Sequence, residues 1–211
     1  MTYQTVESEA INSVYLPVVE TFHSLQGEGA WTGVSAFFIR LAGCDVGCTW
    51  CDTKESWNPK RHQQRNVAEL TQEAKEKAPC IVVITGGEPL MHDLNPLTNS
   101  LRAAGLRVHL ETSGAYPFSG CFDWVTLSPK VAKPPQESVY SHVSELKVVV
   151  VNSKELEWAQ QQAARVPTST LKYLQPEWNT HVASQSLIVE YVKGHPEWRL
   201  SLQTHKFLGV R

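Results

Sequence analysis

The feature that most constrains this chain is a loop with three cysteines, Cys44, Cys48 and Cys51, directly after the apolar run 36–41. Three and then two residues separate the thiols, so one loop can turn all three sulfurs toward a single inorganic centre. A structural zinc site normally has four ligands, and the common ferredoxin pattern adds a fourth cysteine further along. No fourth cysteine lies close by here. A 4Fe–4S cube held by three thiolates would keep one iron free for another ligand.

Two other interpretations of the thiols are open at this point. A structural zinc loop would need a distant fourth ligand, for which His62 and Cys80 are the candidates, and the three cysteines could also be unrelated. The total of five cysteines is odd, and three of them are clustered, which suits a reducing cytoplasm better than a disulfide framework. We expect Cys80 and Cys121 to be small core residues.

The composition excludes several classes of protein. A chain of 211 residues can form one domain over 1–211 with a substantial core. A formal net charge of −2 and the lack of any Lys/Arg run argue against nucleic-acid binding. Residues 1–20 do not have the pattern of a signal peptide, and no apolar stretch approaches the ~18 residues of a membrane span. We therefore expect a cytoplasmic protein without a membrane segment.

Short apolar, β-branched runs alternate with helical patterns along the chain. After an extended segment at 16–21 and a glycine-containing loop at 22–30, the pattern predicts strands over 34–41, 81–85, 107–114, 124–130, 145–152 and 170–176. It predicts helices over 66–77, 94–104 with Gly105 as the stop, 153–164 with Ser153 as N-cap, and 181–193. Residues 56–65 and the tail 198–211 show no assignable pattern.

The alternation indicates an α/β fold with an open parallel sheet covered by helices. Six units are too few for a closed eight-stranded barrel, so we expect a partial (β/α)6-type barrel, with a doubly wound sheet as the alternative. In both folds ligands gather at the carboxyl ends of the strands. The cysteine loop, the turn Gly86-Gly87-Glu88-Pro89, and the polar residues after the later strands all fall at that end.

The glycine turn makes the cysteine loop more specific. Glycines allow a ligand to reach backbone N–H and C=O groups, although the tetrapeptide alone is also an ordinary turn. Together, the C-x3-C-x2-C loop and this turn resemble the radical S-adenosylmethionine (SAM) superfamily. The resemblance implies a 4Fe–4S cluster whose free iron binds SAM, and a partial or full (β/α) barrel.

Further motifs are similar to one family within that superfamily, the 7-carboxy-7-deazaguanine synthases. They cover the chain from about residue 16 to the tail, and they are FHSLQGEG at 22–29, FIRLAGC at 38–44, WCDT at 50–53, ETSG at 111–114, SPK at 128–130, ELK at 145–147, LQP at 174–176 and LQTHK at 202–206. The resemblance implies conversion of 6-carboxy-5,6,7,8-tetrahydropterin to 7-carboxy-7-deazaguanine and ammonia, through hydrogen abstraction by a 5′-deoxyadenosyl radical and ring contraction assisted by Mg²⁺. It also implies a flavodoxin-type electron donor and a homodimer.

The resemblance assigns candidate cofactor residues. Cys44, Cys48 and Cys51 would bind the cluster, and the Thr53 hydroxyl would bind Mg²⁺, a hard ion that prefers oxygen; a turn or helix cap is its ordinary alternative. The residues expected along the SAM path are Trp50, Gly87, Glu88, Ser113, Ser128, Pro129, Lys130, Gln175 and Pro176. We do not expect Lys130 to be a catalytic base.

It also assigns candidate substrate residues. Arg40 is suited to a bidentate grip on the substrate carboxylate, with a structural ion pair as the alternative. Glu28 and Glu111 would contact the pterin, completing with Arg40 the candidate catalytic set; a loop charge and a strand-end cap are their ordinary alternatives. The other expected substrate contacts are Leu25, Gln26, Gly27, Thr85, Gln203 and His205. We expect Trp31 and Trp57 to be packing residues.

Two other functions share part of this pattern. A radical SAM activase, which makes a glycyl radical on a partner protein, has the cysteine and glycine motifs but no need for residues 25–28 or a Mg²⁺ ligand at Thr53. A zinc-loop binding module without enzymatic activity would need only the thiols. Metal content separates the zinc-loop module from the two radical SAM functions. Turnover of the pterin separates the deazaguanine synthase from the activase.

Overall fold

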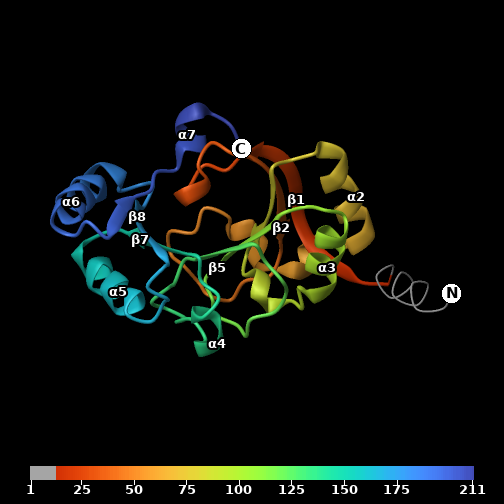
Figure 1. The fold of residues 1–211 in the computed structure, drawn as a ribbon, viewed down its shortest axis with the longest axis horizontal. Coiled ribbons are helices and arrows are strands. Elements are labelled where there is room, and N and C mark those ends of the chain that lie inside the picture. Colours follow the sequence, from red (N-terminus) through yellow and green to blue (C-terminus); the bar gives the residue numbers. More distant parts are fainter. Residues whose placement is uncertain (1–12) are drawn as a thin grey trace.

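The computed structural model describes residues 13–211, and its strands form one nine-stranded sheet in the order β3-β1-β2-β4-β5-β6-β7-β8-β9 (Figure 1). Every neighbouring pair from β2 to β9 is parallel, whereas β1 is antiparallel to both β2 and β3. The strands are β1 (Tyr15–Leu25), β2 (Ser35–Leu41), β3 (Gln63–Asn66), β4 (Ile81–Gly86), β5 (Val108–Thr112), β6 (Trp124–Leu127), β7 (Glu145–Val150), β8 (Leu171–Pro176) and β9 (Trp198–Leu200).

All the helices except the last, α7, pack against one face of this sheet. The helices are α2 (Val67–Lys77), α3 (Asn95–Ala103), α4 (Glu137–Tyr140), α5 (Ser153–Ala163), α6 (His181–Gly194) and α7 (Thr204–Leu208). Side chains of α2 to α6 share one apolar core with Phe37, Ile39 and Leu41 of β2 and with the equivalent residues of β4 to β8. A doubly wound sheet would carry helices on both faces. The six predicted parallel strands and the partial barrel are therefore confirmed, and β9 is a seventh parallel strand.

The other face of the sheet shows why a cavity can form. Side chains alternate between the two faces of a strand, so Phe38 and Arg40 of β2 lie on the face opposite Ile39. Near the amino ends, Ala36, Phe38, Ile81 and Val83 make a small second apolar cluster. Toward the carboxyl ends the same positions become polar, as in Arg40, Thr85, Glu111, Thr126, Lys147 and Gln175. The inner face of the sheet is thus apolar near the amino ends of its strands and polar near their carboxyl ends, where a cavity can form.

Local signals explain most helix boundaries, with one correction. Asn66 caps α2 by accepting a hydrogen bond from Ala68 N at 2.8 Å, and Gly105 ends the α3 segment with a φ of +80°. The predicted N-cap Ser153 is wrong, because Asn152 is the cap of α5. Its side chain accepts from Lys154 N at 3.0 Å, and Glu155 Oε2 accepts from Asn152 N at 2.8 Å, which completes a capping box.

Other expectations differ from the structure where contacts between distant segments determine the secondary structure. β1 continues to Leu25 because it pairs with β2 as far as Leu25 opposite Ser35, so residues 22–25 are strand rather than loop. Residues 63–66 form β3 beside β1, and the tail contains β9 and α7. Cys80 and Cys121 are exposed, so their placement in the core was wrong.

No helix within residues 13–211 is long and apolar enough to cross a membrane. The expectation that residues 1–20 contain no signal peptide falls mainly on residues 1–12, which lie outside the described residues.

Candidate active site

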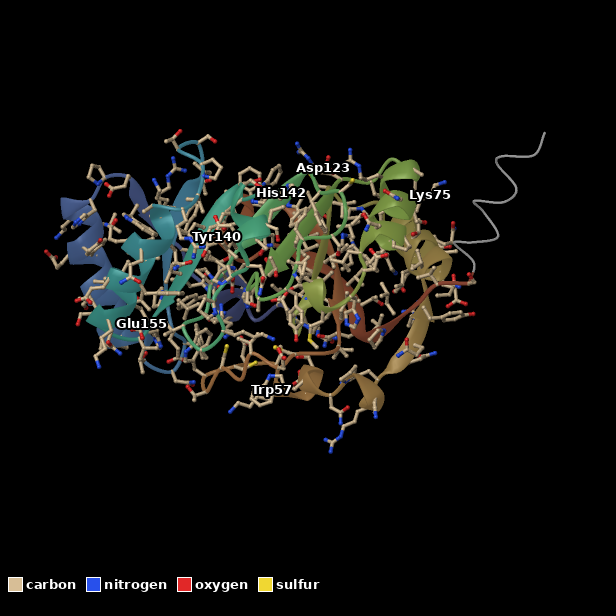
Figure 2. All side chains as sticks on the ribbon, turned by 90° about the horizontal axis from the view of Figure 1, so that it is seen from below. Trp57, Lys75, Asp123, Tyr140, His142 and Glu155 are labelled. Atoms are coloured by element: carbon tan, nitrogen blue, oxygen red, sulfur yellow. The ribbon has the colours of Figure 1, made fainter. Side chains whose placement is uncertain are left out.

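A cavity of about 540 Å³ opens at the carboxyl ends of the parallel strands. Figure 2 shows Trp57, from the segment after β2, at the lower edge of the view, and Asp123 and His142, which precede β6 and β7, toward the upper edge. The cavity is lined by nearly all the predicted site residues: Leu25, Gln26, Gly27, Glu28, Arg40, Cys44, Cys48, Trp50, Cys51, Thr53, Thr85, Gly87, Glu111, Ser113, Ser128, Lys130, Gln175, Pro176, Gln203 and His205. Glu88 and Pro129 are buried outside this lining.

Backbone hydrogen bonds hold the start of the cysteine loop against the glycine turn. Gly87 N donates to Leu41 O at 2.9 Å, and Glu88 N donates to Gly43 O at 2.7 Å. A Cβ placed on Gly87 would collide with the carbonyl of Gly43 and crowd Cys44 Cβ at 3.0 Å. The residue after β4 must therefore lack a side chain for the cysteine loop to sit this close.

The donor set of the loop fits an iron–sulfur cluster. Cys44, Cys48 and Cys51 are free and partly buried, and all three line the one cavity. Within residues 13–211 no three His, Cys, Asp or Glu side chains converge on a point that could hold one metal ion. Three thiolates that bind three different iron atoms of a 4Fe–4S cube do not need to converge on one point.

The alternative of a zinc loop is not supported, because His62 and Cys80, the candidates for the fourth zinc ligand, both lie outside the cavity lining.

The thiols need deprotonation before they bind metal. Burial raises the pKa of Cys44 and Cys48 above the usual thiol value, although the positive charge of Lys130 lowers that of Cys48 in part. Lys130 Nζ donates to Ser128 O and Ser128 Oγ, each at 2.6 Å, and lies 5.3 Å from the centre of the Trp50 ring. Burial lowers the pKa of Lys130 to about 8. This cation is thus fixed beside the thiols.

Glu88 supports the glycine turn from behind. Its carboxylate accepts hydrogen bonds from Leu90 N at 2.9 Å, from Thr112 Oγ1, from Ser113 N at 2.8 Å and from Ser113 Oγ. The side chain therefore ties the end of β4 to the end of β5 and leaves the ligand-facing surface to the backbone of Gly86 and Gly87.

The Thr53 hydroxyl is not used as a cap. Thr53 precedes a short 3₁₀ turn (Lys54–Trp57) without a side-chain cap hydrogen bond, and its Oγ1 lies 3.7 Å from Cys51 Sγ. Its carbonyl accepts from Ser56 N at 2.9 Å and from Ser56 Oγ at 2.6 Å. The ordinary alternative for Thr53 is thereby removed, and a hydroxyl oxygen is presented beside the cluster loop.

Arg40 is held at the rim of the cavity by Glu20. Its Nε donates to Glu20 Oε1 at 3.0 Å, and Arg211 pairs with the other oxygen of the same carboxylate. Both guanidinium groups lie near the ring of Phe22, at 5.7 Å and 5.1 Å. The structural ion pair and the ligand grip are compatible, because the pair uses only Nε and the fork of Arg40 has two further nitrogens.

A hydrogen-bonded chain links the loop after β1 to β4 and β5. Gln26 Nε2 donates to Glu111 Oε1 at 2.9 Å, and Gln26 Oε1 accepts from Glu28 N at 3.1 Å. Thr85 Oγ1 donates to Glu111 Oε2 at 3.2 Å. Because Gln26 has a donor contact on one side and an acceptor contact on the other, the orientation of its amide is fixed.

The tail closes the side of the cavity next to β1. Thr204 N and Thr204 Oγ1 both donate to Gly27 O at 2.9 Å, and the His205 ring packs so closely on Gly27 that a Cβ there would collide with it. Gln203 Nε2 donates to Glu28 Oε1 at 2.9 Å. Gln203 and His205, two of the expected substrate contacts, thus line the cavity on this side.

β8 and β9 complete the wall through one hydroxyl. Ser201 Oγ donates to Gln175 Oε1 at 2.8 Å and accepts from Gly29 N at 3.0 Å. Gln175 is 3% exposed, so its amide is committed to this wall, while Pro176 lines the cavity beside it.

Sequence reasoning missed several lining residues, which include Lys147, Trp178, Lys206 and Arg211. Lys147 carries a recognisable signal, because it and Glu145 are the two charged residues of the otherwise apolar strand β7. The other three have no local signal. Lys206 bonds Asp52 of the cysteine loop at 3.2 Å and lies 4.8 Å from the Trp178 ring centre, contacts that only the folded chain brings about.

Comparisons with known proteins agree with this geometry. A family model described as the Radical SAM superfamily matches residues 38–130. A Synechocystis protein named 7-carboxy-7-deazaguanine synthase is 55% identical over 199 residues, which cover 94% of this chain and 95% of that protein. The protein of that name from Escherichia coli K12 is 34% identical over 221 residues, covering 92% and 98%. The crystal structure of QueE from Escherichia coli matches with a TM-score of 0.84 at 31% identity, covering 94% and 98%.

Proposed function

Because this chain belongs to the 7-carboxy-7-deazaguanine synthase family of the radical SAM superfamily, we propose that it converts 6-carboxy-5,6,7,8-tetrahydropterin to 7-carboxy-7-deazaguanine and ammonia. The observation that carries the proposal is one cavity that is lined both by three free thiols and by Arg40, Glu28 and Glu111. The three thiols suit an iron–sulfur cluster that binds SAM. Arg40 suits the carboxylate of an anionic heterocycle, and Glu28 and Glu111 suit its N–H donors. The chain is an enzyme that uses a 4Fe–4S cluster and SAM.

Cys44, Cys48 and Cys51 would hold the cluster, and the exposed backbone of Gly86 and Gly87 would bind the amino group of SAM. When bound, these cofactors supply the 5′-deoxyadenosyl radical that takes a hydrogen from the pterin; the protein supplies binding, orientation and electrostatics. Lys130, fixed by Ser128, keeps positive charge beside the thiolates. The close Gly87–Gly43 approach supports this arrangement, because any side chain there would fill the space beside the thiols.

The pterin would be held by groups of complementary charge. Arg40 would pair with the substrate carboxylate through the nitrogens that Glu20 leaves free, since a guanidinium fork matches a carboxylate. Glu28 and Glu111 would accept hydrogen bonds from the N–H groups of the guanidine-like edge. Thr53 would provide one oxygen to Mg²⁺, which takes its other ligands from substrate and water. Its hydroxyl makes no cap hydrogen bond and lies beside the cysteine loop, 3.7 Å from Cys51 Sγ, which supports this role.

We also propose a flavodoxin-type electron donor, a homodimer and a cytoplasmic location. Three exposed cations beside the cysteine loop, Lys54, Lys60 and Arg61, support an acidic donor near the cluster. The rate of cluster reduction by flavodoxin should then fall as ionic strength rises. Sedimentation velocity at several protein concentrations measures the molecular mass and tests the homodimer.

An anaerobic assay tests the main proposal. The reconstituted protein is incubated with SAM, dithionite, Mg²⁺ and the pterin, and both 7-carboxy-7-deazaguanine and ammonia are measured. We expect both products in equal amounts. Cleavage of SAM to 5′-deoxyadenosine without the deazaguanine would retain the radical chemistry but overturn the substrate.

A further inference from the structure

Lys147 lies at the centre of the acidic side of the cavity. It is 5% exposed, on the inner face of β7, and its ammonium forms an ion pair with Glu28. Glu111 and Glu145 also act on it electrostatically, and the combined negative charge outweighs burial and raises the pKa of Lys147. The lysine is therefore charged at neutral pH.

Glu28 is the carboxylate that depends most on this lysine. The Glu28 side chain is 15% exposed, and burial by itself would raise its pKa. The charge and the hydrogen bond of Lys147, together with the hydrogen bond from Gln203, lower the pKa of Glu28 to about 2 instead. Glu145 has the opposite net shift: burial raises its pKa, although the charge of Lys147 and the hydrogen bond from Ala30 N to Oε2 at 3.0 Å act to lower it. Unlike Glu28, it is not the ion-pair partner of the lysine.

The ionisation of Glu28 is important because the pterin edge that it would bind carries no positive charge. The guanidine-like edge of a pterin offers N–H donors but no positive charge, so a carboxylate that meets it in a closed cavity gains no counter-charge from the ligand. An uncompensated carboxylate in such a place becomes protonated. The charge that keeps it ionised must then come from the protein, and Lys147 is placed to supply it.

We propose that Lys147 is a positioning residue that keeps Glu28 ionised and fixed, so that Glu28 accepts the N–H groups of the pterin edge. This inference rests on the proposed function. The hydrogen bonds from Gln203 to the Glu28 carboxylate and from Glu28 N to Gln26 set the direction of the Glu28 side chain, and the ion pair with Lys147 keeps it charged. Lys147 therefore affects the pterin only through Glu28.

The test is equilibrium binding of 6-carboxypterin, the stable aromatic form, to the reconstituted holoenzyme with SAM, between pH 5 and 8. We expect wild-type affinity to change little from ionisation of Glu28, because its pKa lies far below this range. In Lys147→Met the opposing charge is gone, burial raises the pKa of Glu28, and affinity falls as pH decreases through the new value. At the acidic end the loss should reach about tenfold or more, the size of a hydrogen bond to a charged group.

Two further variants separate this role from a structural one. Glu28→Gln removes the titrating carboxylate, so its binding should be weak without the new pH dependence, and Glu28→Gln with Lys147→Met should behave like Glu28→Gln alone. Lys147→Arg keeps the charge and should keep the wild-type profile. Cluster content and far-UV circular dichroism of each variant are recorded alongside.

The neighbouring charges are common to all variants. His205 from the tail, Lys130 after β6, Glu111 on β5 and Glu145 on β7 all face this pair. Lys147→Met also removes its positive charge from Glu111 and Glu145. That change is present both with and without Glu28→Gln, so comparing Lys147→Met in the two backgrounds isolates the effect that passes through Glu28.

The outcomes distinguish the inference from its premise. If wild-type protein neither binds nor turns over the pterin, the proposed function fails. If the wild type binds but Lys147→Met shows the wild-type pH profile, or loses affinity equally in the Glu28→Gln background, the role of Lys147 is overturned. A pH-dependent loss that disappears in the Glu28→Gln background supports it.

Discussion

Glu20 of β1 and Arg40 of β2 stand directly opposite each other in the antiparallel ladder, and Arg40 Nε donates to Glu20 Oε1 at 3.0 Å. The pairing depends on an irregularity. Val18 is opposite Leu41, so an unbroken register would put residue 19 opposite Arg40, but a bulge between Val18 and Glu20 shifts the strand by one residue. Bulges re-aim side chains in this way. Here the shift brings a carboxylate to the arginine at the cavity rim.

We predict that Glu20→Gln weakens pterin binding with little effect on SAM. The loss of the charge that orients Arg40 should cost about 1 kcal/mol at this half-exposed position, which corresponds to about a fivefold rise in KM for the pterin. Steady-state kinetics with each substrate varied in turn would measure it.

Glu73→Gln is the matched control. Glu73 pairs with Arg65 at 2.9 Å with a similar exposure, and Glu73 lies outside the cavity lining. Its KM should equal that of the wild type. Equal changes in both variants would mean that Glu20 acts only through general stability.

We next predict that Cys48→Ala prevents assembly of a stable cluster, whereas Cys121→Ala does not. Cys48 lines the cavity with two other thiols, and Cys121 is exposed outside it. Iron and sulfide content after anaerobic reconstitution, with the visible charge-transfer absorbance, gives the answer. Full iron content in Cys48→Ala would mean that this thiol is not a cluster ligand.

The sequence predicts the parts of this molecule that depend on local patterns. Six parallel strands follow from their apolar, β-branched runs, and the cysteine loop and glycine turn share one end because parallel strands carry their following loops to the same edge. It does not predict contacts between distant segments. Nothing near Thr204 indicates that it will bond Gly27, 177 positions earlier, and strand β1 runs to Leu25 only because β2 pairs with it.

Exposure is the other property that local patterns do not determine. Cys80 and Cys121 lie beside apolar segments, yet both are exposed, because each falls in the connection that precedes a strand, β4 or β6, rather than within the strand. Lys147 shows the reverse: a charge in a buried strand was visible in the sequence, but its partner Glu28 is 119 positions away. A charge in a buried strand therefore indicates that a partner exists without identifying it.

The correction at α5 leads to a prediction about stability. Asn152→Ala should lower the free energy of unfolding by about 1 kcal/mol, because it removes the side-chain acceptor for Lys154 N. Ser153→Ala, at the position first expected to be the cap, should change it by less than about 0.5 kcal/mol. Urea unfolding of the two variants compares them directly, and a larger loss in Ser153→Ala would restore the original assignment.

The close approach at the glycine turn gives the last prediction. In Gly87→Ala the new Cβ would collide with Gly43 O and press on Cys44 Cβ, and since the first contact is backbone, relief requires the cysteine loop to move. We expect the variant to fold but to bind SAM at least about tenfold more weakly, because backbone displacements of this kind typically cost about 1–3 kcal/mol. Gly194→Ala, at the end of α6 with no atom within 4 Å of the new Cβ, is the control and should bind SAM normally. Calorimetric titration of SAM into the reconstituted proteins measures both. Wild-type affinity in Gly87→Ala would show that the cysteine loop yields without affecting the SAM site, and the assignment of Gly87 to that site would then be wrong.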